Sequence, residues 1–306
     1  MIDARLLRKL DISNLLGDLS AAHLSAASGL VRVAQHLFVV ADDELSLGVF
    51  DLSSKSPGQL VRLIEGDLPS QHRERKAEKP DLEALTVLPA FGSHAFGALM
   101  AIGSGSRPNR QRAVLLPLDR HGAVQGNPAH VDLAPLYERL RARFGDLNIE
   151  GLFISDSKFC LLQRGSRGSQ VNACVQFEWT EVERWIEGAK EVPEFRAIEV
   201  FDLGCIHDVP LCFTDGAALQ GGGWVFCAAA EDTSDSYSDG RCLGSAVGLV
   251  SAAGKMVRLE QITGALKAEG IAVTSDGDPL ELLLVTDADD RLAAASLLSV
   301  TLPRGP

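Results

Sequence analysis

A short phrase recurs five times along the 306-residue chain: a small or acidic residue, then Gly or Ala, and then an aliphatic residue that opens a hydrophobic run. The five copies begin at Ser28, Glu83, Glu150, Asp215 and Glu269. They are spaced by roughly 55 to 67 residues, which suits a four-stranded propeller blade with its loops. A fixed period of tens of residues indicates a repeat architecture. We therefore predict an all-β fold, a single β-propeller of five blades, with six blades as the alternative.

The segments behind each copy follow one order. The second run is nearly continuous in apolar residues and suits a strand that is buried on both faces. These second strands are predicted at 37–40, 98–102, 159–162, 224–227 and 282–285. Third strands follow in all five repeats, and fourth strands are predicted at 59–64, 129–133, 197–203 and 256–261. The fifth repeat lacks a fourth strand.

The missing strand is predicted at the other end of the chain. Residues 5–12 resemble the fourth strands at 61–64 and 257–259. If residues 5–12 pair beside 297–302, the first strand closes the last blade and removes two sheet edges. We expect one domain over residues 1–306, with a helical insertion at about 133–145 and a second short helix from Thr180, its N-cap, to Ala189. The charged segment 71–80 is predicted to be a solvated loop.

Composition excludes several classes of protein. The formal net charge of −12 argues against nucleic-acid and anionic-membrane partners, which need clustered Lys and Arg. No segment approaches a membrane-spanning length or resembles a signal peptide, so a cytoplasmic location is expected. None of the six cysteines has a CxxC spacing, which disfavours disulfides and zinc. The sequence does not indicate an oligomeric state.

The recurring phrase also predicts a metal site. The first strand of each propeller blade lines the central channel, so the five phrase-opening residues are expected to form a ring near one mouth. Four carboxylates at close quarters require protons or a cation. Ca²⁺ fits best because it accepts six to eight oxygens in flexible geometry, Mg²⁺ is less suitable, and the absence of His disfavours zinc. The predicted ligands are Ser28, Glu83, Glu150, Asp215 and Glu269; the alternative is that these residues only cap strands or bind backbone amides.

Two turns after second strands predict an anion site. Gly105-Ser106-Arg107 recurs as Gly165-Ser166-Arg167, and Arg164 precedes the second copy. Arg presents a planar fork that matches phosphate or carboxylate oxygens. The matching turn of the first repeat is acidic and carries Asp42 and Asp43, which could orient water. Exposed turns with solvated arginines are the alternative. The polar segment 233–240 is a candidate lid.

The phrases resemble those of the soluble calcium-activated nucleotidases (apyrases), which are five-bladed propellers with calcium on the channel axis. Ser28-Gly29-Leu30-Val31 is similar to that family's Ser-Glu-Leu-Val, Glu83 to Val87 to its Glu-Trp-Leu-Ala-Val, and Glu269-Gly270-Ile271 to its Glu-Gly-Ile. The chain also looks like bacterial propellers of the esterase-like-phytase and gluconolactonase types. It departs from the nucleotidases at Glu44, where they carry Arg after Asp-Asp. The resemblance thus supports the metal more than it supports nucleotide hydrolysis.

Together these features predict a calcium-dependent hydrolase of a small anionic ester, either a phosphoester or a phosphoanhydride. The ion would polarise a substrate oxygen or orient water. The residues predicted to act on the substrate are Asp42, Asp43, Arg107, Arg164 and Arg167. One alternative is a noncatalytic propeller in which calcium is a structural pin and the rim binds a ligand or a protein. A second alternative is a lactonase-type metalloenzyme.

Overall fold

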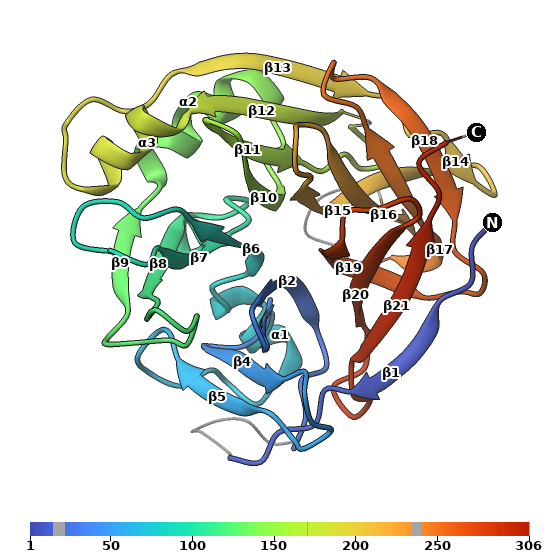
Figure 1. Ribbon diagram of the computed structural model, residues 1–306, viewed down its shortest axis with the longest axis horizontal. Coiled ribbons are helices and arrows are strands. Elements are labelled where there is room, and N and C mark those ends of the chain that lie inside the picture. Colours follow the sequence, from blue (N-terminus) through green and yellow to red (C-terminus); the bar gives the residue numbers. More distant parts are fainter. Residues whose placement is uncertain (15–21, 170, 234–239, 306) are drawn as a thin grey trace.

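The computed structural model is a closed ring of five small sheets around a central axis (Figure 1). It describes residues 1–14, 22–169, 171–233 and 240–305. Within these ranges each sheet is one blade and all its strand pairs are antiparallel. The prediction of a five-bladed all-β propeller is confirmed, and the six-bladed alternative is wrong.

The first three blades each contain four strands in sequence order, with the first strand nearest the axis. Blade 1 consists of β2 (Ala27–Val33), β3 (His36–Ala41), β4 (Ser46–Asp51) and β5 (Gln59–Arg62). Blade 2 consists of β6 (Leu82–Leu88), β7 (Ala98–Gly103), β8 (Arg112–Pro117) and β9 (Ala129–Asp132). Blade 3 consists of β10 (Ile149–Ser155), β11 (Lys158–Gln163), β12 (Asn172–Glu178) and β13 (Phe195–Phe201).

The last two blades depart from this plan. Blade 4 consists of β15 (Val209–Ala218), β16 (Trp224–Asp232), β17 (Arg241–Val250) and β18 (Met256–Gln261), with the short β14 (Cys205–Ile206) added beside β15. The sequence pattern did not predict β14. Blade 5 consists of β19 (Lys267–Ser275), β20 (Leu280–Asp287), β21 (Ser296–Leu302) and the N-terminal β1 (Arg5–Lys9).

The N-terminal segment closes the ring, as predicted. β1 pairs with β21 from Arg5 opposite Ser299 to Lys9 opposite Ser296. The flanking residues reach the neighbouring blades: the Ile2 amide donates to the Gln261 carbonyl at 2.9 Å, and the Ser13 amide donates to the Gly58 carbonyl at 2.8 Å. The first 13 residues therefore connect blades 4, 5 and 1.

Three α-helices lie in the described part of the chain, and none is long and apolar enough to cross a membrane. The predicted insertion is α2 (Ala134–Phe144), which buries Leu136, Tyr137 and Leu140. The helix α3 (Trp179–Ile186) begins one residue earlier than predicted, and its N-cap is Glu178, without a side-chain hydrogen bond, so the Thr180 cap is wrong.

The prediction of a solvated loop at 71–80 is also wrong. Residues His72–Glu78 form α1. The Arg75 side chain of this helix is 2% exposed and donates to the Asp43 carbonyl at 2.9 Å and to Glu44 Oε1 at 2.8 Å. These bonds fix α1 to the turn after β3. A buried guanidinium is costly unless it is hydrogen-bonded and paired with a negative charge, and the Asp43 carbonyl and the Glu44 carboxylate meet these two needs.

A β-bulge interrupts the first strand of every blade at the same place. In blade 1, Ala27 and Gly29 pair with the consecutive residues Ala41 and Val40, which leaves Ser28 unpaired. The unpaired residues in the five blades are Ser28, Glu83, Glu150, Thr214 and Glu269. A bulge re-aims the side chain of the extra residue. Four of these residues are the predicted ring positions, but in blade 4 the equivalent residue is Thr214 instead of Asp215.

The glycines after the bulges of blades 1 and 5 are explained by the approach of neighbouring first strands. A Cβ atom on Gly29 would lie 2.8 Å from the Leu85 amide nitrogen, and one on Gly270 would lie 2.9 Å from the Ser28 carbonyl oxygen. Contacts this short do not occur for real side chains. In blades 1 and 5 the glycine of the recurring phrase is therefore a packing requirement at the centre of the ring.

Deleting residues 1–12 should strongly destabilise the fold. The deletion exposes the β21 edge and removes the buried side chains of Leu10 and Ile12, which are 0% and 4% exposed. At about 1.5–3 kcal/mol per buried aliphatic side chain and about 1 kcal/mol per lost hydrogen bond, the expected loss is on the order of 5 kcal/mol or more. Urea unfolding would measure this loss, with Leu6→Ser, at a 55% exposed side chain, as the control. A truncated chain that unfolds at the wild-type urea concentration would contradict closure.

Candidate functional site

The bulges open onto a polar cavity of about 70 Å³ at one mouth of the channel. Ser28, Glu83, Glu150 and Glu269 line it from four blades. Residues that end or follow second strands also line it, namely Asp42, Arg164, Glu231 and Asp287. All five blades thus contribute to one inner cavity.

Charged side chains dominate the lining of the inner cavity. The carboxylates are Asp42, Asp81, Glu83, Glu150, Glu231, Glu269 and Asp287. The cationic side chains are Lys76, Lys79, Arg110, Arg164 and Lys267. Seven carboxylates therefore face five cations, so the fully ionised lining has two excess negative charges. In a buried setting such an excess must be relieved by protons or by a bound cation.

Two cations lie over the blade 3 to blade 5 side of the ring. Arg164 contacts Glu231 at 2.6 Å and Glu150 at 3.2 Å, and its nearest Glu269 oxygen is 3.9 Å away. Lys267 contacts Asp287 at 3.0 Å and Glu269 at 3.3 Å. Glu269 Oε1 nevertheless receives no hydrogen bond from the described residues, although its side chain is only 5% exposed. It is a buried acceptor that a cation or a water molecule would satisfy.

A third cation lies on the blade 1 to blade 2 side. Lys79 follows α1, and its backbone amide donates to the Arg75 carbonyl at 2.7 Å. Its ammonium contacts Asp42, and it contacts Asp81 at 2.9 Å. Arg110 contacts the second Asp81 oxygen at 2.8 Å. The helix that the sequence did not predict therefore delivers a cation to the cavity.

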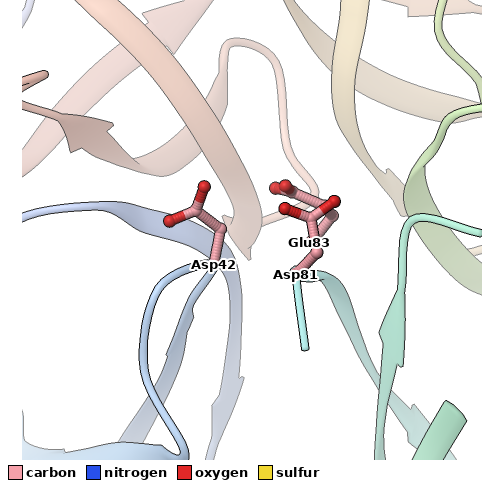
Figure 2. Close-up of side chains that lie close together, drawn as sticks. All are labelled: Asp42, Asp81 and Glu83. Atoms are coloured by element: carbon pink, nitrogen blue, oxygen red, sulfur yellow. The ribbon is translucent and has the colours of Figure 1, made fainter. Parts of the chain in front are cut away.

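Asp42, Asp81 and Glu83 form the group best arranged to hold a metal ion. Each offers an oxygen within 4.8 Å of the others. Figure 2 shows Asp42 on blade 1 facing Asp81 and Glu83, which project from the start of blade 2. Glu83 accepts no hydrogen bond and forms no ion pair with any residue in the described ranges. We call these three residues the acidic triad.

Burial strongly favours the protonated forms of several carboxylic acids here. Burial raises the pKa of Glu83 well above its ordinary value, and the charges of Glu150, Asp81 and Asp42 raise it further. Burial likewise raises the pKa of Asp42 to about 7, although Lys79 opposes the shift. The pKa of Glu269 rises to about 8 for the same reason, against Lys267 and Arg164. Without a cation, protons therefore take up the excess charge near neutral pH.

Asp215 is placed differently from the other predicted ligands. Its side chain is buried, and its two oxygens accept hydrogen bonds from the amides of Gly216 at 2.8 Å and Ile271 at 3.0 Å. It does not line the inner cavity. Asp215 thus ties the first strand of blade 4 to that of blade 5, which is the backbone-binding role that the sequence left open as the alternative.

The predicted arginines are divided between the cavity and the surface. Only Arg164 lines the cavity. Arg167 is half exposed and pairs with Asp232, while Arg107 is exposed at the N-terminal end of the short 3-10 helix η1 (Pro108–Arg110). Neither lines the two cavities at this mouth. Most of the candidate lid, residues 234–239, lies outside the described ranges.

A second, wider cavity of about 360 Å³ adjoins the first between blades 5 and 1 and α1. Asp42, Lys76, Lys79, Lys267 and Asp287 line both cavities. Asp43, the other predicted carboxylate, lines this outer cavity and lies 3.5 Å from Arg75 and 3.6 Å from Arg291. The outer cavity therefore gives access to the acidic triad.

Sequence reasoning missed Asp81, Lys79, Arg110 and Lys267. The sequence did contain a signal for Asp81 and Lys267. Each stands two residues before a bulge residue and lines the cavity, and so does Asn148 in blade 3. Lys79 and Arg110 come from segments outside the repeat, so the repeat gave no indication of them.

The raised pKa values predict how stability depends on pH. A group whose pKa is higher in the folded than in the unfolded protein stabilises the fold at low pH, and this stabilisation is lost as the pH rises through the folded value. For Asp42 and Glu269 those values are about 7 and 8. Without divalent cations, the free energy of unfolding should fall as the pH rises from about 4.5 to about 8, by up to about 1.4 kcal/mol per pH unit for each proton.

Urea unfolding in chelator-treated buffer at several pH values would measure this fall. Asp81 and Asp287 have lowered pKa values, so they act below this window. Glu269→Gln mimics the protonated acid and should flatten the profile. A wild-type stability that is constant or rises over this range would contradict the assignment.

None of the curated proteins matches the chain. Solved structures resemble it at low sequence identity. A luciferin-regenerating enzyme matches with a TM-score of 0.49 and 10% identity over 100% of this chain and 96% of that chain. An α-L-arabinofuranosidase from Podospora anserina matches with a TM-score of 0.49 and 10% identity over 96% and 94% of the two chains. A gluconolactonase from Xanthomonas campestris matches with a TM-score of 0.41 and 13% identity over 90% and 72%.

These identities are too low to transfer an activity to this chain. The sequence of the chain does match one protein family. Residues 23–302, which include all five bulges, match the family of unknown function DUF6929. The chain therefore belongs to the DUF6929 family.

Proposed function

We propose that this protein is a divalent-cation-dependent hydrolase that acts on a small anionic ester at the mouth of its channel. The observation that carries the proposal is the inner cavity, in which seven carboxylates face five cations and three of the carboxylates are close enough to share one ion. Buried carboxylates in excess of their cations are costly for folding alone. A cluster of such carboxylates in a cavity is therefore a candidate functional site.

The residues present fit a hard cation. The triad supplies only carboxylate oxygens, and no His or Cys lines the inner cavity. Oxygen ligands suit Ca²⁺ and Mg²⁺ better than zinc, and the irregular arrangement of the wall favours Ca²⁺. Asp42, Asp81 and Glu83 would hold the ion. Glu150 is close enough for its charge to raise the pKa of Glu83, so it is a further candidate ligand.

The bound cation would supply Lewis-acid polarisation of a substrate oxygen or of water. The residues of the outer cavity would bind the anionic substrate and orient water. Lys267 and Arg291 line this cavity and can neutralise an anion. Asp43 lines the outer cavity without belonging to the triad, and its Oδ1 has no hydrogen-bond partner among the described residues, so its carboxylate is suited to orient water.

The chief alternative is a noncatalytic propeller with calcium as an axial pin. Two features support the hydrolase over it. Asp215 already ties first strands together near the axis by direct hydrogen bonds. The triad instead lies to one side, between blades 1 and 2, and borders a cavity of about 360 Å³ through Asp42. A ligand site needs such access, whereas a pin does not.

Glu83→Gln should weaken Ca²⁺ binding at least tenfold, because it removes one carboxylate charge and no hydrogen bond among the described residues. Isothermal titration calorimetry on chelator-treated protein would measure the affinity. Glu281→Gln is the matched control, since Glu281 is exposed on β20 and its side chain does not line the cavity. Equal Ca²⁺ affinity for wild type and Glu83→Gln would refute the triad as the cation site.

The hydrolase itself is tested with a panel of phosphomonoesters, phosphodiesters, phosphoanhydrides and lactones, each with and without Ca²⁺. Calcium-stimulated turnover that Glu83→Gln abolishes and Glu281→Gln retains would support the proposal. Turnover of lactones alone would favour the lactonase alternative. Calcium binding without any turnover would favour the noncatalytic propeller.

A further inference from the structure

Lys79 occupies the place where the proposed cation would bind. Its ammonium contacts Asp42 and lies 2.9 Å from Asp81, so it touches two of the three members of the acidic triad. Its side chain is 11% exposed. Within the described residues these two carboxylates are its ion-pair partners, and both are potential metal ligands.

An ammonium and a divalent cation cannot both use these oxygens fully. The two Lys79 contacts are charge-assisted hydrogen bonds, which are among the stronger ones in proteins. A metal ion that coordinates Asp42 and Asp81 must weaken or replace them. The internal cation therefore competes directly with an external one.

The outer cavity can accommodate the Lys79 ammonium when a cation displaces it. It lines the outer cavity of about 360 Å³ as well as the inner one. Lys is a flexible side chain with four methylene groups, so its ammonium can move while its backbone stays fixed. The backbone of Lys79 is fixed by its bond to the Arg75 carbonyl and by Asn109, which donates to the Lys79 carbonyl at 3.0 Å.

We propose that Lys79 is an exchangeable internal counterion: a divalent cation displaces its ammonium from Asp42 and Asp81 into the outer cavity, where it becomes a ligand for an anion. This inference rests on the proposed function, because it assumes that the triad binds a cation. It predicts ordered binding, with the cation first and the anionic substrate second. The cation and the anion then strengthen each other's binding, as reciprocity requires.

The first test compares Ca²⁺ affinity in wild type and Lys79→Met by titration calorimetry. Lys79→Met should bind Ca²⁺ at least tenfold more tightly, because no ammonium has to be displaced. Lys76→Met is the control for the loss of a positive charge. Lys76 lines the same cavity, yet it is not among the main charges that set the pKa values of the triad. The Ca²⁺ affinity of Lys76→Met should differ from that of the wild type by less than threefold.

The second test measures coupling to an anion. The probe is phenylphosphonate, whose C–P bond is not cleaved by hydrolysis. Saturating Ca²⁺ should strengthen phenylphosphonate binding at least fivefold in wild type and in Lys76→Met, but less than twofold in Lys79→Met. Equal strengthening in wild type and Lys79→Met would overturn the role of Lys79 as an anion ligand.

The third test uses only the wild-type protein, in case Lys79→Met does not fold. Lysine acetylation followed by mass spectrometry reports the accessibility of each ammonium. Ca²⁺ should increase the labelling rate of Lys79 severalfold and leave that of the exposed Lys255 unchanged. An unchanged Lys79 rate at saturating Ca²⁺ would overturn the displacement.

The outcomes separate the two proposals. If neither wild type nor Lys79→Met binds Ca²⁺, the cation site fails and the inference fails with it. If wild type binds Ca²⁺ but Lys79→Met binds it no more tightly, only the role of Lys79 is overturned. Binding by Lys79→Met alone would support the competition and show that the ammonium excludes Ca²⁺ from the wild-type protein.

Discussion

The backbone contact between neighbouring first strands is the constraint on which the rest of the structure depends. Five strands converge so closely that a Cβ atom on Gly29 or Gly270 would collide with the next blade. The strands accommodate this approach with a bulge in every blade, and the bulge leaves one residue per strand outside the ladder. In three blades this residue is a glutamate that reaches the inner cavity. The packing of the ring thus determines where charge gathers.

The buried carboxylates of the inner cavity require cations beside them. Blade 5 supplies Lys267 two residues before Glu269, and blade 3 supplies Arg164 beside Glu150. On the blade 1 to blade 2 side, α1 brings Lys79 to Asp42 and Asp81, and η1 brings Arg110 to Asp81. The three carboxylates on this side are matched in number by the cations Lys76, Lys79 and Arg110, yet Glu83 itself makes no hydrogen bond or ion pair within the described residues. The excess of negative charge lies on the blade 3 to blade 5 side, where four carboxylates face the two cations Arg164 and Lys267.

The sequence was sufficient for the ring, its five blades and its closure, because each of these follows from a repeated apolar pattern. It was also sufficient to bring Glu83, Glu150, Glu269 and Ser28 to one cavity. It misplaced the fourth copy by one residue, since Asp215-Gly216 matches the phrase while the bulge falls on Thr214. It could not find Lys79 or Arg110, because these residues meet the ring through α1 and η1, which follow no repeat. Their positions depend on contacts such as that of Arg75 with Glu44, which join segments of different blades.

The closure of blade 5 by β1 also has a consequence for biosynthesis. β1 pairs with β21, which follows every other strand of the ring in the described sequence. Residues 5–9 therefore cannot form this pairing until β21 has been synthesised. The inner cavity needs Asp287 and Glu269 beside Asp42, so it can assemble only when blade 5 reaches blade 1. A chain interrupted before β19 would display an open sheet edge and would lack the cavity, which links formation of the site to synthesis of blade 5.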